Sequence, residues 1–394
     1  MTTLIGPPAN GAEAVARDLL AHVEDLTGEL VGRIRTGDHA YAESTALTAD
    51  LLQPVVHDNL AAVLGQLAGT SVRRLHPAIA AGRVKAELGI PLAALMHAYR
   101  LAGRLIWEHS LATATSASQD ALPVLASEVW RLIDDYSSAA AQAYTDFLTE
   151  RARRAEHERQ AMLRALLRGD VDGPALLDTT RALQLPQLGT FVVAYAETGA
   201  ASTEPLPGIQ TRLRAAFINS AWLTEPGARI GLVSLTGPQA LDQALTLLQR
   251  AATGRVGVSR PFPSAAAART AVREAELATR CARPGAPTVT RYGSAPVPLV
   301  LAHSPVAAQE LADDILGPIL ELPDEDRDAL LDVLELRFDC GGSNIEVAQR
   351  LHYHRNTIHH RLRRIETLTG RRCSDPKAAA ELYIALRAAR LHGT

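Results

Sequence analysis

The sequence predicts a multidomain protein with an N-terminal all-α helical bundle, a central α/β domain and a C-terminal all-α domain. Three observations carry this prediction: helical periodicity up to residue 150, alternating strand and helix signals over residues 170–295, and renewed helical periodicity after residue 326. The 394 residues suffice for two or three domains, and a hydrophobic content of 47% lets each domain bury a core.

Five segments are expected along the chain. They are a helical domain over 12–150, a connecting helix over 151–169, an α/β domain over 170–295, a linker over 296–325 and a helical domain over 326–394. The linker is placed where several prolines lead into an acidic run, because proline interrupts regular structure.

Residues 91–111 show the clearest helical pattern of the N-terminal region. Apolar side chains recur at helical spacing from Leu92 to Leu105, and Pro91 suits a helix first turn. Residues 144–167 predict a charged helix with a broken apolar stripe. That stripe fits pairing with a second copy of the chain, and it fits equally a solvated linker helix.

Two sets of residues in this region are weighed as ligand sites. A polar set recurs at helical spacing and comprises His97, Arg100, Arg104 and Glu108. We interpret it as a polar stripe or an interhelical ion pair rather than as the lining of a pocket. An aromatic set comprises Tyr99, Trp107 and Trp130, and we interpret it as core rather than as a ligand cage.

The central region alternates between the two kinds of element. Strands are predicted over 189–197, 221–223, 229–235, 254–258 and 288–290, and helices over 211–220, 238–251 and 264–281. A turn at Glu225-Pro226-Gly227 would join the second and third strands, because proline and glycine favour turns.

Several classes of protein and site are excluded by composition. The net charge of −3 argues against a generic polyanion binder, so any nucleic-acid contact requires a local basic patch. The three cysteines lack both zinc-site spacing and a disulfide pattern. No signal peptide and no apolar run of membrane-spanning length is found, which predicts a cytoplasmic protein without membrane contact. No phosphate-binding loop and no catalytic triad is found.

Residues 344–365 predict two short helices joined by a small turn, the geometry of a helix-turn-helix. Asn344 is expected to cap the first helix. The expected inner faces comprise Ile345, Ala348 and Leu351 on the first helix and Ile358, Leu362 and Ile365 on the second, which begins near Arg355.

The outer face of the second helix then carries side chains that suit a DNA duplex. Asparagine can bind adenine through two hydrogen bonds, and arginine can bind guanine or a phosphate. The predicted DNA-binding residues are His354, Arg355, Asn356, Thr357, His359, His360, Arg363 and Arg364. The four histidines among residues 352–360 lie on different faces, so we predict no metal site there.

Charge is segregated in the way a DNA-binding tail requires. Residues 341–394 contain nine Arg and one Lys against three Glu and one Asp, a net charge of +6, so the rest of the chain carries −9. The alternative is an ordinary basic helical hairpin that packs on another domain.

At these residues the chain resembles the PucR-type regulators, the purine-catabolism and sugar-diacid regulator group. The matching residues are Ala348, Leu351, His354, Asn356, Thr357, Arg361, Leu362, Arg364, Ile365, Glu366, Leu368, Thr369, Gly370 and Pro376, followed by a final apolar helix over 378–391. His360 stands where the family often has Tyr, so the family's base preference is not carried over.

The resemblance extends upstream. Residues 186–292 are similar to the degenerate GGDEF-like domain of these regulators, in which active relatives carry glycines and acidic metal ligands on a hairpin turn. The corresponding turn, residues 224–228, has no such acidic pair, which implies no catalysis and no cofactor. Residues 91–110 are similar to the helical sensor-like domain of this group and of stressosome co-antagonist proteins.

The expected function is that of a sequence-specific transcriptional regulator that binds double-stranded DNA. The resemblance implies a homodimer or higher homo-oligomer, and a small-molecule effector that the sequence does not identify. Two alternatives from other classes are a non-catalytic stressosome-like scaffold and an enzyme of nucleotide signalling. DNA binding separates the regulator from the scaffold, and a cyclic-dinucleotide synthesis assay separates it from the enzyme.

Overall fold

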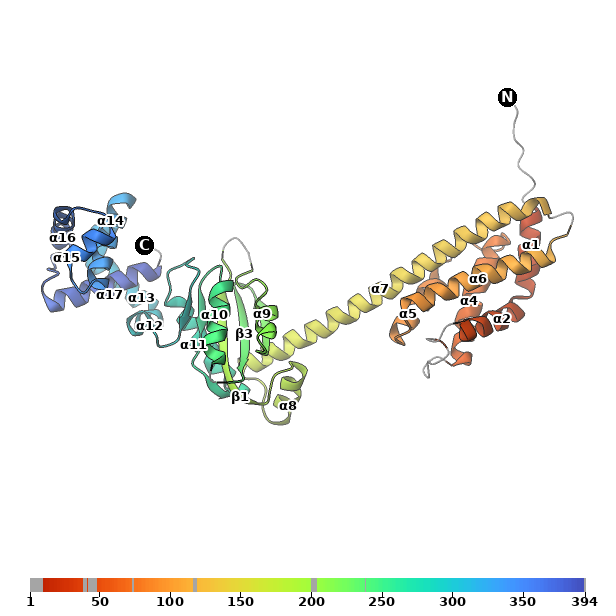
Figure 1. Ribbon diagram of the computed structural model, residues 1–394, viewed down its shortest axis with the longest axis horizontal. Coiled ribbons are helices and arrows are strands. Elements are labelled where there is room, and N and C mark those ends of the chain that lie inside the picture. The colour runs from red at the N-terminus through yellow and green to blue at the C-terminus, as the bar shows by residue number, and fades with distance from the viewer. Residues whose placement is uncertain are drawn as a thin grey trace, which may run out of the picture. The chain divides into compact units, whose positions relative to one another are not determined.

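The computed structural model describes residues 10–37, 41, 48–72, 74–115, 119–199, 204–237 and 239–392 (Figure 1). The chain divides into two compact units, residues 1–156 and 157–394. The expected fold class is confirmed, because a helical region, a small mixed sheet and a C-terminal helical region follow one another along the chain.

In its described residues, the first unit contains helices and no strand. They are α1 (Asn10–Ala21), α2 (Val23–Gly37), α4 (Ala49–Leu67), α5 (His76–Glu87), α6 (Leu92–Thr113), the short 3-10 helix η1 (Gln119–Ala121) and the first part of α7 (Leu122–Arg168). Their apolar faces form one core that includes Leu64, Leu105 and Tyr136. Helices α5 and α7 cross closely at Gly82, where an added Cβ would lie 2.1 Å from the carbonyl oxygen of Ala140.

Helix α7 has 47 residues, and the predicted connecting helix is its C-terminal part rather than a separate element. In the second unit, Leu163, Leu166 and Leu167 of this helix are buried against the sheet. That part of the apolar stripe is therefore covered within the chain and is not available to a second copy. Leu148 and Met162 of the same stripe remain exposed.

The second unit begins with a mixed sheet. Its strands are β1 (Leu188–Glu197), β2 (Ser220–Glu225), β3 (Ala228–Leu235), β4 (Val256–Val258), β5 (Phe262–Ser264) and β6 (Val289–Arg291). The order is β2-β3-β1-β4-β6, and β5 pairs with β1. All pairs are antiparallel except β4 with β6. In the central pair, Val193 lies opposite Leu232.

Helices cover both faces of this sheet (Figure 1). Two helices pack on the face that carries Phe191, Val193 and Leu232. They are α11 (Ala268–Arg280) and the C-terminal part of α7. Helices α9 (Ile209–Ala215) and α10 (Ala240–Ala251) pack on the other face. Alternate residues of β1 therefore point into two separate cores, as the pleat of a strand requires.

The sequence prediction of this region differs from the structure in four places. The helix expected over 211–220 ends at Ala215, because the chain must reverse to begin β2. Helix α8 (Gly173–Ala182) and the three-residue strand β5 were not predicted. The helix expected over 264–281 is the 3-10 helix η2 (Ala265–Ala267) followed by α11.

The segment predicted as a linker, 296–325, instead folds as helices. It contains α12 (Pro296–His303) and α13 (Pro305–Leu320), and Ala312, Ile315 and Leu316 of α13 are buried in the C-terminal core. Both helices begin with proline, a position where the missing N–H costs nothing. Two of the prolines that suggested a linker, Pro296 and Pro305, therefore mark helix starts, whereas Pro318 lies inside α13.

The remaining helices complete the C-terminal core. They are α14 (Asp324–Asp339), α15 (Asn344–Arg350), α16 (Arg355–Thr369) and α17 (Pro376–His392). Across the described parts of the chain, no helix is long and apolar enough to cross a membrane, and no cluster of three metal-ligating side chains is found. Cys281, Cys340 and Cys373 are free thiols.

Candidate DNA-binding surface

Helices α15 and α16 form the predicted pair, joined by residues 351–354. The cap of α15 is Ser343 rather than Asn344: the Ser343 hydroxyl accepts a hydrogen bond from the Glu346 amide at 3.3 Å. Asn344 is the first residue of the helix. The expectation at Asn344 was wrong by one residue because serine and asparagine cap helices equally well, and only geometry chooses between neighbours.

The inner face of α16 is as predicted, since Ile358, Leu362 and Ile365 are buried. The prediction for α15 was wrong at Ile345, whose side chain is 57% exposed. Val347 takes its place in the core beside Ala348. The helix has only seven residues, so the short apolar pattern fits two faces and the packing decides which is buried.

The turn is held by local contacts. His352 adopts a left-handed backbone conformation with φ 54°, and the Tyr353 amide donates to the Ala348 carbonyl at 2.9 Å. The guanidinium of Arg361 stacks 4.4 Å from the centre of the Tyr353 ring. This contact ties the turn to the middle of α16.

His354 caps α16 through its ring. The ring Nδ1 accepts a hydrogen bond from the Asn356 amide at 3.2 Å, which places the proton of the neutral ring on Nε2. His354 was predicted to contact DNA, and only Nε2 remains for such a contact while this cap persists.

The structure places the predicted DNA-binding residues together on α16 and its first turn. The exposed members are His354, Arg355, Asn356, His359, His360, Arg363 and Arg364. Thr357 is half-buried, so it offers less of its side chain than predicted.

Most of these side chains have no partner among the residues that the structure describes. In the described residues, no hydrogen bond or ion pair engages the side chains of Arg355, Asn356, His359, His360 and Arg363. Arg364 differs, because its Nη2 pairs with Asp326 Oδ2 at 2.9 Å. Both side chains of that pair are about half exposed, so the pair is weak and competes with any outside partner of Arg364.

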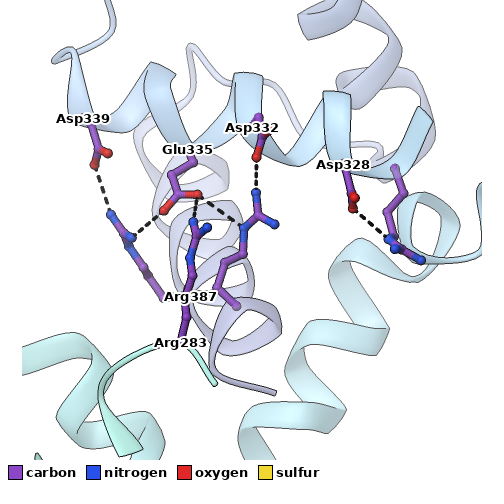
Figure 2. Close-up of polar contacts among 8 residues, drawn as sticks. Arg283, Asp328, Asp332, Glu335, Asp339 and Arg387 are labelled. Atoms are coloured by element: carbon purple, nitrogen blue, oxygen red, sulfur yellow. Dashed lines mark hydrogen bonds and ion pairs between the residues drawn. The ribbon is translucent and has the colours of Figure 1, made fainter. Parts of the chain in front are cut away.

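Other arginines of the C-terminal region are neutralised by α14, which the sequence prediction missed. Acidic side chains recur along one face of this helix: Asp328, Asp332, Glu335 and Asp339 (Figure 2). Arg387 of α17 donates to Glu335 and to Asp339, each at 3.0 Å. The helical spacing of the four acids was the available signal.

Glu335 is the centre of this network. Its carboxylate also pairs with Arg390 at 3.3 Å and with Arg283, which follows α11 and belongs to the sheet-containing region (Figure 2). The Glu335 side chain is only 14% exposed. The arginines of α17 therefore serve the internal packing, and the unpaired positive charge of the C-terminal region lies mainly on α16.

The turn between β2 and β3 carries one acidic residue, Glu225. Its carboxylate accepts a hydrogen bond from Nε of Arg164 on α7 at 3.0 Å. The only carboxylate of this turn is thus part of an ion pair that attaches α7 to the sheet.

The candidate residues of the first unit behave mostly as interpreted. Glu108 forms an interhelical ion pair with Arg33 of α2 at 2.7 Å and lies 3.7 Å from Arg104. Tyr99 is buried in the core, but Trp130 is half exposed, so the core interpretation was wrong for Trp130.

Comparison with known proteins assigns each region to a family domain. Residues 330–388 match the PucR C-terminal helix-turn-helix domain. Residues 168–281 match the GGDEF-like domain, and residues 24–159 match the RsbT co-antagonist protein rsbRD N-terminal domain. All three domains that the sequence resembles are thereby confirmed.

Two individual proteins are similar over part of their length. The purine catabolism regulatory protein of Bacillus subtilis (strain 168) is 34% identical over 101 residues, which cover 25% of this chain and 19% of that protein. The crystal structure of a regulator of polyketide synthase expression from Bifidobacterium adolescentis matches with a TM-score of 0.29 and 20% identity. That match covers 60% of this chain and 93% of the other.

Proposed function

We propose that this chain, whose residues 330–388 match the PucR C-terminal helix-turn-helix domain, is a sequence-specific DNA-binding transcriptional regulator of the PucR type. Helix α16 enters the major groove and reads base edges there. The observation that carries the proposal is the exposed face of α16, where basic and amide side chains lack partners among the described residues although the opposite face is buried.

The residues on this face divide by their chemistry. Asn356 and His360 lie one helical turn apart and are assigned to base edges, because an amide can form two hydrogen bonds with adenine. Arg355 and Arg363 are assigned to phosphates or to guanine, for which the planar guanidinium is suited. His354, Thr357, His359 and Arg364 flank this face and contact the backbone of the duplex.

The protein acts as a homodimer or higher homo-oligomer, so that two helices α16 contact two half-sites. Two linked contacts strengthen binding without new chemistry. The central domain has a structural rather than a catalytic role, which the ion pair of Glu225 supports. The signal is a small-molecule effector received upstream of the C-terminal domain.

The test selects bound fragments from genomic DNA with the full-length protein and repeats the selection with Asn356→Ala and Arg363→Ala. Asn356→Ala should relax the preference at one base position, at a cost of about 1–3 kcal/mol in binding. Arg363→Ala should weaken binding to all sequences alike and reduce the salt dependence by about one phosphate contact.

Arg250→Ala is the matched control, because Arg250 is an exposed arginine of α10 in the central domain. It removes the same charge and should leave DNA binding unchanged. Equal effects of Arg250→Ala and Arg363→Ala would contradict the assignment of the α16 face. Failure to select any DNA, with capture of a partner protein instead, would favour the scaffold.

A further inference from the structure

Lys85 of α5 is a buried cation in the first unit. Its side chain is 2% exposed, and among the described residues its ammonium nitrogen has no hydrogen-bond acceptor. The ammonium lies over the ring of Tyr41, with the ring centre 5.3 Å away. A buried charge without a counter-ion is unfavourable, and burial lowers the pKa of Lys85 to about 8.

This lysine lines a cavity of about 50 Å³, and the other lining residues are Tyr41 and residues of α2, α4, α5, α6 and α7. The lining is predominantly aliphatic and includes Leu30, Val56, Leu95 and Ile106. A space of this size holds more than one water molecule, for which roughly 10–15 Å³ suffices. Its apolar lining favours a small ligand whose body is apolar.

The other polar side chains of the cavity are already engaged. The Tyr99 hydroxyl donates to Asn59 Oδ1 at 2.9 Å, and Asn59 Nδ2 donates to the carbonyl oxygens of Val55 at 2.8 Å and Pro77 at 3.1 Å. Lys85 is thus the donor that remains for a ligand. A phosphate or a dicarboxylate would need several further donors, whereas a single carboxylate needs one cation.

We propose that this cavity binds a short-chain monocarboxylate, whose carboxylate pairs with the Lys85 ammonium and whose alkyl chain packs against the aliphatic lining. Binding supplies the missing counter-ion and buries apolar surface at the same time. The role of this ligand as the regulator's signal rests on the proposed function, whereas its binding does not.

Calorimetric titration of the full-length protein without DNA tests the proposal, with butyrate and butyramide as probes. The two molecules have nearly the same shape, but only butyrate is charged. Butyrate should bind at least about tenfold more tightly, which corresponds to about 1.4 kcal/mol. Equal affinity for both probes, or no binding of either, would overturn the proposal.

Lys85→Met keeps most of the length of the side chain and removes its charge. It should abolish the preference for butyrate over butyramide and raise the melting temperature by roughly 2–4 °C, because the unpaired charge is gone. Unchanged butyrate binding in this variant would also overturn the proposal. If the variant does not fold, the affinities of the natural chain for butyrate and butyramide still test the proposal.

The pH dependence of butyrate binding gives a separate readout. The cavity lining from α2, α4, α6 and α7 is otherwise uncharged, and its remaining titratable groups are Tyr41 and Tyr99, of which burial raises the pKa of Tyr99. Above about pH 8, free Lys85 must take up a proton to pair with the carboxylate, so the affinity should fall about tenfold per pH unit. A pH-independent affinity between pH 7 and 10 would contradict pairing with Lys85.

DNA binding is measured in separate samples with and without butyrate. If the protein binds butyrate but no DNA, the proposed function is contradicted and the proposed ligand site is supported. If the protein binds DNA but no carboxylate, the proposed function is supported and the proposed ligand site is contradicted.

Discussion

His352, in the turn before α16, has a backbone conformation that side chains with a Cβ rarely adopt. Glycine adopts it without strain, so His352→Gly should stabilise the C-terminal domain by about 1 kcal/mol. Thermal unfolding measures the change, and DNA affinity should stay the same because His352 precedes the proposed reading face. Destabilisation would show that the His352 side chain makes a contact the strain argument omits.

The titration of Lys85 should make the free energy of unfolding depend on pH. Its folded pKa of about 8 lies below its ordinary value of 10.5, so the unfolded chain binds more protons between these values. The free energy of unfolding should therefore rise from pH 8 to 10.5, by up to about 3 kcal/mol for this group. The difference between the natural chain and Lys85→Met isolates the effect, and a difference that does not change with pH would refute it.

Among the elements, α14 depends on Glu335. Glu335→Gln removes the charge that Arg283, Arg387 and Arg390 share, and it should destabilise the second unit by roughly 2 kcal/mol. Asp339→Asn is the control, because the exposed Asp339 has one arginine partner and its loss should cost less than about 1 kcal/mol. Equal costs for both, measured by thermal unfolding, would show that Glu335 is not the centre of the network.

Asp326, at the start of α14, restrains one proposed DNA contact. Asp326→Asn should free Arg364 and remove a negative charge near the duplex, and thereby raise DNA affinity about two- to fivefold. Asp328→Asn on the same helix is the comparison, since Asp328 pairs with Arg327 rather than with a residue of α16. The outcome that counts against the prediction is a loss of affinity in Asp326→Asn alone.

The buried face of a helix can be predicted from the sequence when its apolar pattern repeats over several turns. Ile358, Leu362 and Ile365 recur over two turns of α16, so both its buried face and its exposed face could be derived from spacing. Helix α15 is too short for this, and its face was misassigned at Ile345. Short strands such as β5 carry no period at all and depend on pairing with β1.

Long-range contacts explain the remaining differences. Prolines 296 and 305 are compatible with a linker and with helix starts, and the choice is made by burial of the helices in the C-terminal core. Arg364 pairs with Asp326, which lies far away in the sequence, and Lys85 has no hydrogen-bond partner among the described residues. Neither this ion pair nor the cavity beside Lys85 could therefore be derived from residue spacing.

For the whole molecule, charge separation is the property on which the account depends. The chain has a net charge of −3, yet residues 341–394 carry +6. Internal ion pairs neutralise Arg387 and Arg390 on α17, whereas Arg355 and Arg363 on α16 are exposed and have no ion-pair partner among the described residues. An acidic remainder disfavours binding of the rest of the chain to DNA, so contact is confined to one surface. DNA binding by full-length protein should therefore require α16.

Site-specific photo-crosslinking measures this contact most directly. A photoreactive amino acid replaces His360 in one full-length variant and the exposed Gln243 of α10 in another, and each is irradiated with a selected genomic fragment. The account predicts crosslinks from position 360 to a few adjacent nucleotides of each half-site and none from position 243. Bound protein that crosslinks from position 243, or that never crosslinks from position 360, would contradict it.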